Sequence, residues 1–122
     1  MQASQYAMTI DRKPTCVLKF ESISNPFTNI QQRLYLTELI DDGYNYFIFD
    51  LSRLQYISSE GLNFLLNALT TIRNNGGDMV LAAVTDSVDK LLYMTRLRAV
   101  FSILETVEAA LETVVAKGMD EG

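Results

Sequence analysis

A nearly continuous apolar run, NYFIFDLS at residues 45–52, is the feature that most limits what this chain can fold into. The run is shorter than an ordinary helix, and aromatic and β-branched residues are frequent in it. This pattern is typical of a β-strand that is covered on both faces. We therefore expect a central strand in a sheet, with helices packed on that sheet.

The clearest helix of the chain begins after a six-residue connection, SRLQYI at residues 52–57. Its apolar side chains recur at i, i+3, i+4, i+7 and i+10, a spacing that forms one stripe along a helix. These side chains are Leu62, Leu65, Leu66, Leu69 and Ile72. The sequence NNGG at residues 74–77 ends this helix, and DMVLAAV at residues 78–84 is typical of a second buried strand.

Two strands are expected ahead of this core, at residues 6–12 and 15–23. Both segments fit the pattern of short strands, and a possible turn lies between them. The sequence therefore predicts a hairpin around Lys13-Pro14.

A helix, IQQRLYLTELIDDG, is expected at residues 30–43. Thr28 or Asn25 is the predicted N-cap, and Gly43 is the predicted left-handed C-cap. The apolar residues are spread widely around the axis, so the pattern predicts the helix but not the face that it buries.

The last third of the chain predicts two more helices with a strand between them. In the helix TDSVDKLLYMTRL, Asp86 or Ser87 is the expected cap, and the inward-facing residues are Val88, Leu91 and Leu92. The strand is AVFSIL at residues 99–104. The final helix, TVEAALETVVAKG, has Thr106 as its expected cap and an apolar stripe made of Val107, Ala110, Leu111, Val114 and Val115.

The predicted order is therefore β-β-α-β-α-β-α-β-α. Such alternation makes a single α/β domain with a mixed, mostly parallel sheet, in which the opening hairpin is the antiparallel part. We expect this domain to span residues 1–122, with a core at about 5–116 and a frayed tail at 117–122. In such sheets, functional residues tend to lie where strands end and helices begin.

Composition excludes several functional classes. The net charge of −5 argues against nucleic acid as a partner, because Arg96 and Arg98 are the nearest approach to a basic patch. The chain has no histidine, and its one cysteine, Cys16, is expected in the core of a strand, so we expect no metal site and no cofactor. No segment resembles a signal peptide or a membrane span, and a cytoplasmic protein is expected.

The pair Ser58-Ser59 lies where the central connection meets the clearest helix. A serine at this point is the expected N-cap, because its hydroxyl accepts from an otherwise unpaired amide, but one serine is enough for that role. Gly61 in the first turn costs about 1 kcal/mol relative to alanine and indicates a close approach by another group. A helix start also favours an anion, so a phosphate on one serine is chemically reasonable.

The segment FDLSRLQYISSEGLNFLL at residues 49–66 resembles the signature of the STAS domain of bacterial anti-sigma factor antagonists. The resemblance extends over the whole chain, through the element order and the NNGG break. It implies that the serine two residues before the glycine, Ser59, is phosphorylated by an anti-sigma factor with GHKL-type serine kinase activity. Ser58 is the less favoured acceptor. A PP2C-type phosphatase is a further implied partner.

Two residues depart from the family pattern. Ser58 occupies the place usually held by aspartate, and Glu60 that of a small residue. The resemblance implies that the unphosphorylated protein binds the anti-sigma factor and thereby frees the sigma factor. The partner-binding residues expected around this helix start are Ser58, Ser59, Glu60, Gly61, Asn63, Phe64 and Asn67.

Phe64 lies off the apolar stripe, on the side shared by Glu60 and Asn67. It is expected either as an exposed aromatic anchor for the partner or as a residue packed against the neighbouring helix.

Two other functions stay open. The departures at Ser58 and Glu60 leave room for a phosphorylation-independent STAS scaffold or a subunit of a lipid-transport complex. An enzyme with a serine nucleophile or with strand-end carboxylates is the weaker alternative, because no base is apparent for Ser59 and no catalytic residue is expected. Asp50 is expected to accept hydrogen bonds from the loop before the serine pair, which is a structural role.

Overall fold

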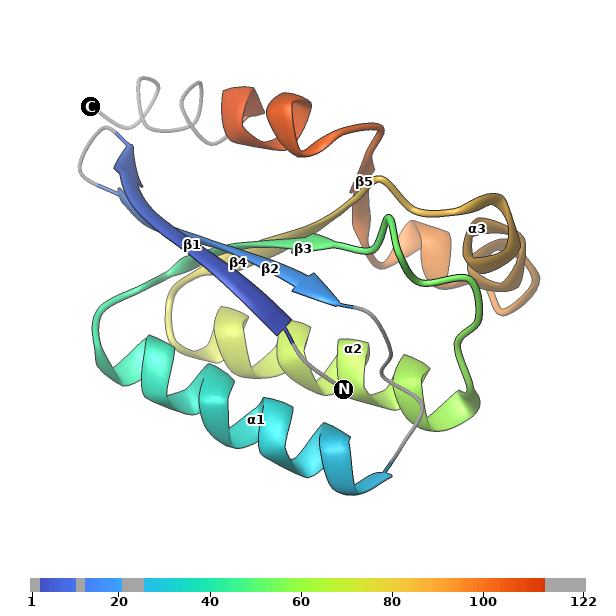
Figure 1. Ribbon diagram of the computed structural model, residues 1–122, viewed down its shortest axis with the longest axis horizontal. Coiled ribbons are helices and arrows are strands. Elements are labelled where there is room, and N and C mark those ends of the chain that lie inside the picture. Colours follow the sequence, from blue (N-terminus) through green and yellow to red (C-terminus); the bar gives the residue numbers. More distant parts are fainter. Residues whose placement is uncertain (1–2, 11–12, 21–25, 114–122) are drawn as a thin grey trace.

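The computed structural model describes residues 3–10, 13–20 and 26–113, with side chains described for residues 15–20 and 33–113 (Figure 1). Within these residues five strands form one sheet in the order β1-β2-β3-β4-β5. The strands are β1 (Ala3–Ile10), β2 (Lys13–Phe20), β3 (Tyr46–Asp50), β4 (Asp78–Ala82) and β5 (Ser102–Leu104). β1 and β2 are antiparallel and the other neighbours are parallel, so the predicted mixed sheet is confirmed.

The α-helices of the described residues follow the predicted order around this sheet, and a short 3₁₀ helix, which was not predicted, replaces the start of the strand expected at residues 99–104. They are α1 (Pro26–Asp41), α2 (Ser59–Asn74), α3 (Asp86–Met94), the short 3₁₀ helix η1 (Leu97–Ala99) and a C-terminal helix at residues 107–113. Figure 1 shows α1 and α2 side by side on one face of the sheet, the C-terminal helix on the other face, and α3 beyond one end. No helix in the described ranges combines the length and apolarity that a membrane crossing requires.

Strand β3 is buried on both faces, as its apolar run predicts. Phe47 and Phe49 belong to the core cluster that α1, α2 and α3 cover. Ile48, between them in sequence, belongs to a second cluster beneath the C-terminal helix, where it packs with Val17 and Ala110. Because successive side chains of a strand point to opposite faces, one short strand contributes to both layers.

Helix α1 begins at Pro26, a residue suited to the first helical position because the proline has no amide to leave unpaired. Thr28 lies inside the helix, so the prediction of Thr28 as its cap is wrong, and Asn25 lies outside the described residues. Gly43 adopts a φ of 105°, and the amide of Tyr44 donates to the carbonyl of Leu39 at 3.1 Å. The predicted glycine C-cap is therefore confirmed.

The turn of the opening hairpin does not lie where the sequence predicts it. Lys13 and Pro14 are the first residues of β2, opposite Ile10 and Thr9, so the connection lies between Ile10 and Lys13 rather than at Lys13-Pro14. The start of a strand tolerates proline, and the parallel pairing of β2 with β3 begins only at Thr15. Local turn chemistry could not show this, because the position of the turn depends on which residues β1 and β2 pair.

Other local predictions are confirmed or fall outside the described residues. Thr106 caps the C-terminal helix, since its hydroxyl accepts from the amide of Ala109 at 3.0 Å. Cys16 is fully buried, and this burial raises the pKa of its thiol to about 11, so it stays protonated and unreactive at neutral pH. Val114, Val115 and the predicted tail at 117–122 lie outside the described residues.

The NNGG segment ends α2 and returns the chain to the sheet. Asn75 is the C-cap and Gly76 has a φ of 83°, which favours glycine. Gly77 has a different constraint, because a Cβ placed there would overlap the backbone carbonyl of Asn45. The two connections at this end of the sheet, which lead into β3 and β4, therefore touch through bare backbone, and the amide of Asp78 donates to the same carbonyl at 2.9 Å.

We predict that Gly77→Ala lowers the free energy of unfolding by about 1–3 kcal/mol, the usual cost of overpacking. Gly76→Ala is the matched control, since it strains only the backbone of an open position and should cost about 1 kcal/mol. Urea titration of both variants measures the two values. An equal or smaller loss for Gly77→Ala would show that the two connections do not meet at this point.

Candidate functional site

The connection from β3 to α2 is held by the core on one side. Leu51, Leu54 and Ile57 recur every three residues and are all buried. The amide of Leu51 donates to the carbonyl of Ala82 at 3.0 Å, and the carbonyl of Leu54 accepts from the hydroxyl of Thr85 at 2.7 Å. The connection is thus bound to β4 and to the start of α3, and it delivers the serine pair to a defined place.

Two sequence predictions concern residues at or beside this connection. Asp50 accepts a hydrogen bond from the amide of Ser52 at 3.0 Å, which confirms its structural role. The cap of α3 is Thr85, so the prediction of Asp86 or Ser87 is wrong. The hydroxyl of Thr85 donates to the carbonyl of Leu54 instead of capping its own helix. That contact is between segments 31 residues apart, which local sequence does not reveal.

The two serines have different structural positions. Ser58 is the N-cap of α2: its backbone is extended, and its Oγ accepts from the amide of Gly61 at an N–O distance of 3.2 Å. Ser59 is the first helical residue and its side chain is exposed. Because Ser58 already performs the capping, the exposed side chain of Ser59 lies outside the cap, at the positive end of the helix dipole.

The exposed part of the predicted surface is polar. Glu60, Asn63 and Asn67 are exposed along with Ser59, on the outward side of α2. Gly61 is buried, so it contributes its capped amide rather than a surface contact. These residues therefore form a narrow polar strip that begins at the serine pair.

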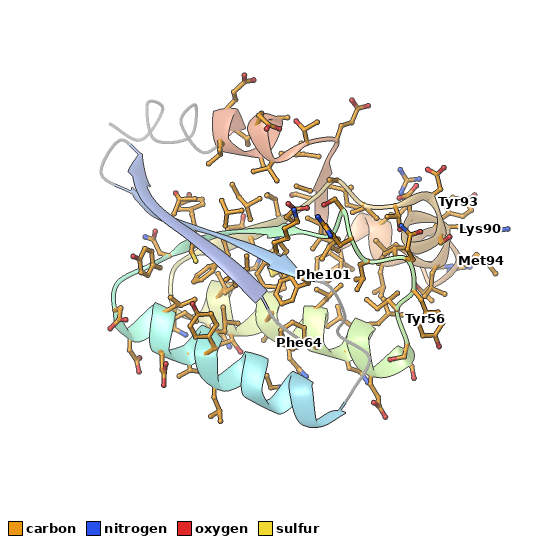
Figure 2. All side chains as sticks on the ribbon, viewed as in Figure 1. Tyr56, Phe64, Lys90, Tyr93, Met94 and Phe101 are labelled. Carbon is orange, nitrogen blue, oxygen red and sulfur yellow. The ribbon has the colours of Figure 1, made fainter. Side chains whose placement is uncertain are left out.

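Phe64 is not an exposed anchor, and that alternative is wrong. Its side chain is 1% exposed and lies in the core, as Figure 2 shows. Its ring centroid is 5.9 Å from that of Phe20 and 6.4 Å from that of Phe49, so it packs on the sheet. The reason is that α2 is covered by both the sheet and α1, which buries a wider arc than one stripe. The spacing of Gly61, Phe64 and Ala68, all buried, was the available signal.

A groove of about 460 Å³ adjoins the serine pair. Tyr56, Ile57, Ser58, Ser59 and Leu62 line one side of it, and Ser87, Leu91 and Thr95 of α3 line the other. Tyr56 is 70% exposed, which is unusual for a large aromatic side chain. Neither Tyr56 nor the α3 wall was among the predicted site residues, although an aromatic residue in a polar connection beside the serines was a detectable sign.

Large exposed apolar side chains continue beyond this groove. Tyr93 and Met94 of α3 are each 68% exposed, whereas Val88 and Leu92 on the inner side of the same helix are buried as predicted. Figure 2 shows Tyr56, Tyr93 and Met94 at the same end of the molecule, pointing outward. Exposed apolar residues gathered in this way indicate a protein-interaction surface.

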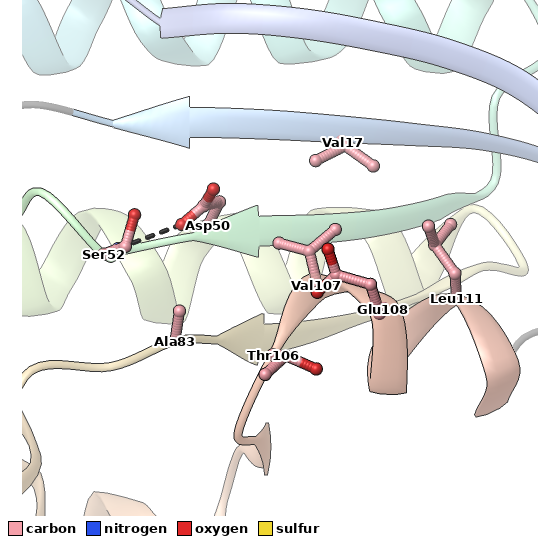
Figure 3. Close-up of a pocket in the computed structure, with 8 residues that line it drawn as sticks. All are labelled: Val17, Asp50, Ser52, Ala83, Thr106, Val107, Glu108 and Leu111. Carbon is pink, nitrogen blue, oxygen red and sulfur yellow. Dashed lines mark hydrogen bonds between the residues drawn. The ribbon is translucent and has the colours of Figure 1, made fainter.

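A separate hollow of about 440 Å³ lies where the C-terminal helix packs on the sheet (Figure 3). Its acidic groups are Asp50 and Glu108, and its apolar wall comes from Val17, Val107 and Leu111. It shares no lining residue with the serine groove. The strand-end carboxylates are therefore not placed in the groove beside Ser59.

The lining of the serine groove is uncharged within the described residues. Hydroxyl, amide and apolar side chains line it, and no carboxylate, lysine or arginine is among its described lining residues. A serine nucleophile is activated by a neighbouring base, such as a carboxylate or a neutral lysine. Within the described ranges, no group of three acidic or cysteine side chains is placed to hold a metal ion.

The comparison with protein families decides the classification. The model of the STAS domain matches residues 7–110, which is most of the chain. This chain belongs to the STAS domain family. The expectation drawn from the segment at residues 49–66 is thereby confirmed, and the match includes the whole serine site.

Several related proteins are named as anti-sigma factor antagonists. A Thermotoga maritima protein provisionally named an anti-sigma factor antagonist is 31% identical over 80 residues, covering 66% of this chain and 71% of that protein. The crystal structure of such a protein from the same organism superposes with a TM-score of 0.77 at 23% identity, covering 90% of this chain and 93% of the other.

The anti-sigma factor antagonist SpoIIAA in its unphosphorylated form superposes with a TM-score of 0.73 at 19% identity, covering 91% of this chain and 96% of the other. A structure of SpoIIAA from Bacillus in its phosphorylated form superposes with a TM-score of 0.68 at 19% identity. At these identities the structural neighbours show that the STAS protein shares their fold.

We predict that Ser58→Ala lowers the stability of this STAS protein by about 1 kcal/mol, because Gly61 loses the acceptor for its amide. Ser59→Ala should change stability by less than about 0.5 kcal/mol, as expected for an exposed side chain. Urea titration of both variants measures the difference. The reverse ranking would mean that Ser59 is the cap, and the assignment of the two serines would have to be exchanged.

Proposed function

We propose that this STAS protein is an anti-sigma factor antagonist that is switched by phosphorylation of Ser59. The unphosphorylated protein binds an anti-sigma factor with GHKL-type serine kinase activity and frees the sigma factor. The observation that carries the proposal is the division between the serines, with Ser58 holding the cap and Ser59 exposed. A PP2C-type phosphatase would restore the binding form.

The departure at Ser58 is compatible with this function. Aspartate and serine are both good N-cap residues, because each offers a side-chain oxygen to the amides of the first turn. Ser58 does this through its bond from Gly61, so replacement of the family's aspartate preserves the helix start. Glu60 is exposed in the first turn, where a carboxylate is favoured by the helix dipole. It would also repel a phosphate on Ser59, which favours the unphosphorylated state.

The energies indicate a switch in binding without unfolding. A phosphate adds a charge of roughly −1.5 to −2 and three acceptor oxygens. At the start of α2 its interaction with the helix dipole is favourable by about 0.3–1 kcal/mol. A partner pressed against Ser59 would have to bury that charge, at a cost of several kcal/mol. Since each 1.4 kcal/mol changes affinity about tenfold, the effect on the interface is the larger one.

The contact surface in this proposal differs from the one that sequence alone indicated. Ser59, Asn63 and Asn67 supply its polar part, and Tyr56 replaces Phe64 as the aromatic anchor. Tyrosine is among the residues that most often dominate interface energies. In this proposal, a side chain of the partner inserts into the groove between Tyr56 and Leu91.

We predict that a GHKL-type anti-sigma kinase from the same genome adds one phosphate to Ser59, detectable by mass spectrometry. Ser59→Ala should accept none, and Ser58→Ala, after correction for stability, should still be phosphorylated. Ser59→Asp should weaken kinase binding at least tenfold, with a circular dichroism spectrum like that of the wild type. No added phosphate and unchanged binding of Ser59→Asp would favour the phosphorylation-independent scaffold or lipid-transport subunit.

We further predict that Tyr56→Ala weakens binding to the same kinase by about tenfold or more and leaves stability close to that of the wild type. Phe64→Ala is the contrasting variant, because loss of its buried ring should lower the free energy of unfolding by about 3–5 kcal/mol. Calorimetric binding and urea titration measure the two effects. Full affinity of Tyr56→Ala would remove this residue from the interface.

A further inference from the structure

A second groove lies where α3 meets η1, and it shares no lining residue with the serine groove. It has a volume of about 830 Å³, and we call it the α3–η1 groove after the elements that form it. It is lined by Tyr93, Met94, Arg96, Arg98, Ala99 and Ile103. Figure 2 shows Lys90, Tyr93 and Met94 of α3 pointing outward. Ser59 is not among the residues that line this second groove.

The charged side chains that line this groove are basic, Arg96 and Arg98, whereas Asp86, Asp89 and Glu105 line an adjoining hollow. Residues 90–98 contain three of the ten lysines and arginines, Lys90, Arg96 and Arg98, in a chain whose net charge is −5. Arg98 is engaged by Asp89, with Nε and Oδ1 3.1 Å apart. Arg96 is exposed and makes no ion pair with another described residue. Its guanidinium is therefore available to a partner's carboxylate.

The backbone of Arg96 gives independent support. Arg96 directly follows Thr95, the C-cap of α3, and adopts a left-handed conformation with φ 64° and ψ 17°. Glycine is the usual residue at this position of a helix end, because it adopts that conformation without strain. Arginine is less favourable there, and residues held in such conformations concentrate at functional sites.

We propose that the α3–η1 groove binds an acidic, amphipathic segment of the anti-sigma factor. Tyr93 and Met94 contact the apolar side of that segment, and Arg96 pairs with its carboxylates. Methionine adapts to varied apolar surfaces, and tyrosine and arginine are frequent interface anchors. This inference rests on the proposed function, and it adds a second contact that lies outside the groove lined by Ser59.

Nucleic acid fits the same groove less well. Phosphate-backbone binding needs several available cations along a path, and here Arg98 already pairs with Asp89. The exposed apolar side chains of Tyr93 and Met94 also require an apolar counterpart, which an amphipathic protein segment provides.

The test uses the full chain and the same GHKL-type kinase, with affinity and rates measured by surface plasmon resonance. Arg96→Gly should weaken binding about tenfold while leaving the urea midpoint equal to or above that of the wild type. The loss should shrink as NaCl rises from about 0.05 M to about 0.5 M, because salt screens the pairing. Arg73→Ala in the last turn of α2, at the end of that helix away from Ser59, is the matched control, since it removes the same charge from another exposed site and should leave affinity unchanged. Met94→Ala should weaken binding without this salt dependence.

The outcomes separate this inference from the proposed function. If the two contacts are independent, the changes in binding free energy from Arg96→Gly and Ser59→Asp should add in the double variant. If Arg96→Gly and Met94→Ala bind as tightly as the wild type while Ser59→Asp binds more weakly, the second contact is overturned and the switch stands. If Ser59→Asp binds with full affinity while Arg96→Gly binds more weakly, the switch is overturned and the second contact stands. Equal losses for Arg96→Gly and Arg73→Ala would reject specific pairing at Arg96.

Discussion

The burial of β3 on both faces is the constraint on which the rest of the structure depends. Phe47 and Phe49 point into the core beneath α1 and α2, and Ile48 points into the core beneath the C-terminal helix. A strand held from both sides has no freedom to shift by one residue, because a shift would exchange its two sets of side chains. The position at which β3 ends, and from which the chain proceeds to the serine pair, is set by this packing.

The same core extends along the connection to α2. Leu51, Leu54 and Ile57 are buried, and hydrogen bonds to Ala82 and Thr85 fix the path between them. The first turn of α2 is therefore held at one place relative to the sheet before any partner binds. In the proposed function, this fixed helix start lets a phosphate on Ser59 alter recognition without a change of fold.

Ser58 and Ser59 are adjacent, but they have separate roles because they occupy different positions at the start of α2. The hydroxyl of Ser58 is occupied by the amide of Gly61, and the side chain of Ser59 lies outside the cap. In the proposed function, stability and regulation are therefore carried by neighbouring side chains that can be altered independently. The exposed Tyr56, Tyr93 and Met94 place apolar contacts at the same end of the molecule.

Much of this protein follows from the sequence by itself. The element order, the two-sided burial of β3, the glycine that ends α1 and the Thr106 cap depend on patterns within short segments, and local periodicity and hydrogen-bonding preferences are enough to predict them. The resemblance of residues 49–66 to a known signature likewise indicated the family, and it indicated Ser59 as the candidate phosphorylation site.

Only the tertiary structure decided which side chains are available to a partner. Phe64 is buried because α1 and the sheet together cover more of α2 than one apolar stripe, and Tyr56 is exposed because Leu54 and Ile57 face the core instead. The α3 wall of the serine groove joins residues about thirty positions apart in sequence. Exposure depends on how many elements pack around a residue, and that number is a property of the assembled layers rather than of any single segment.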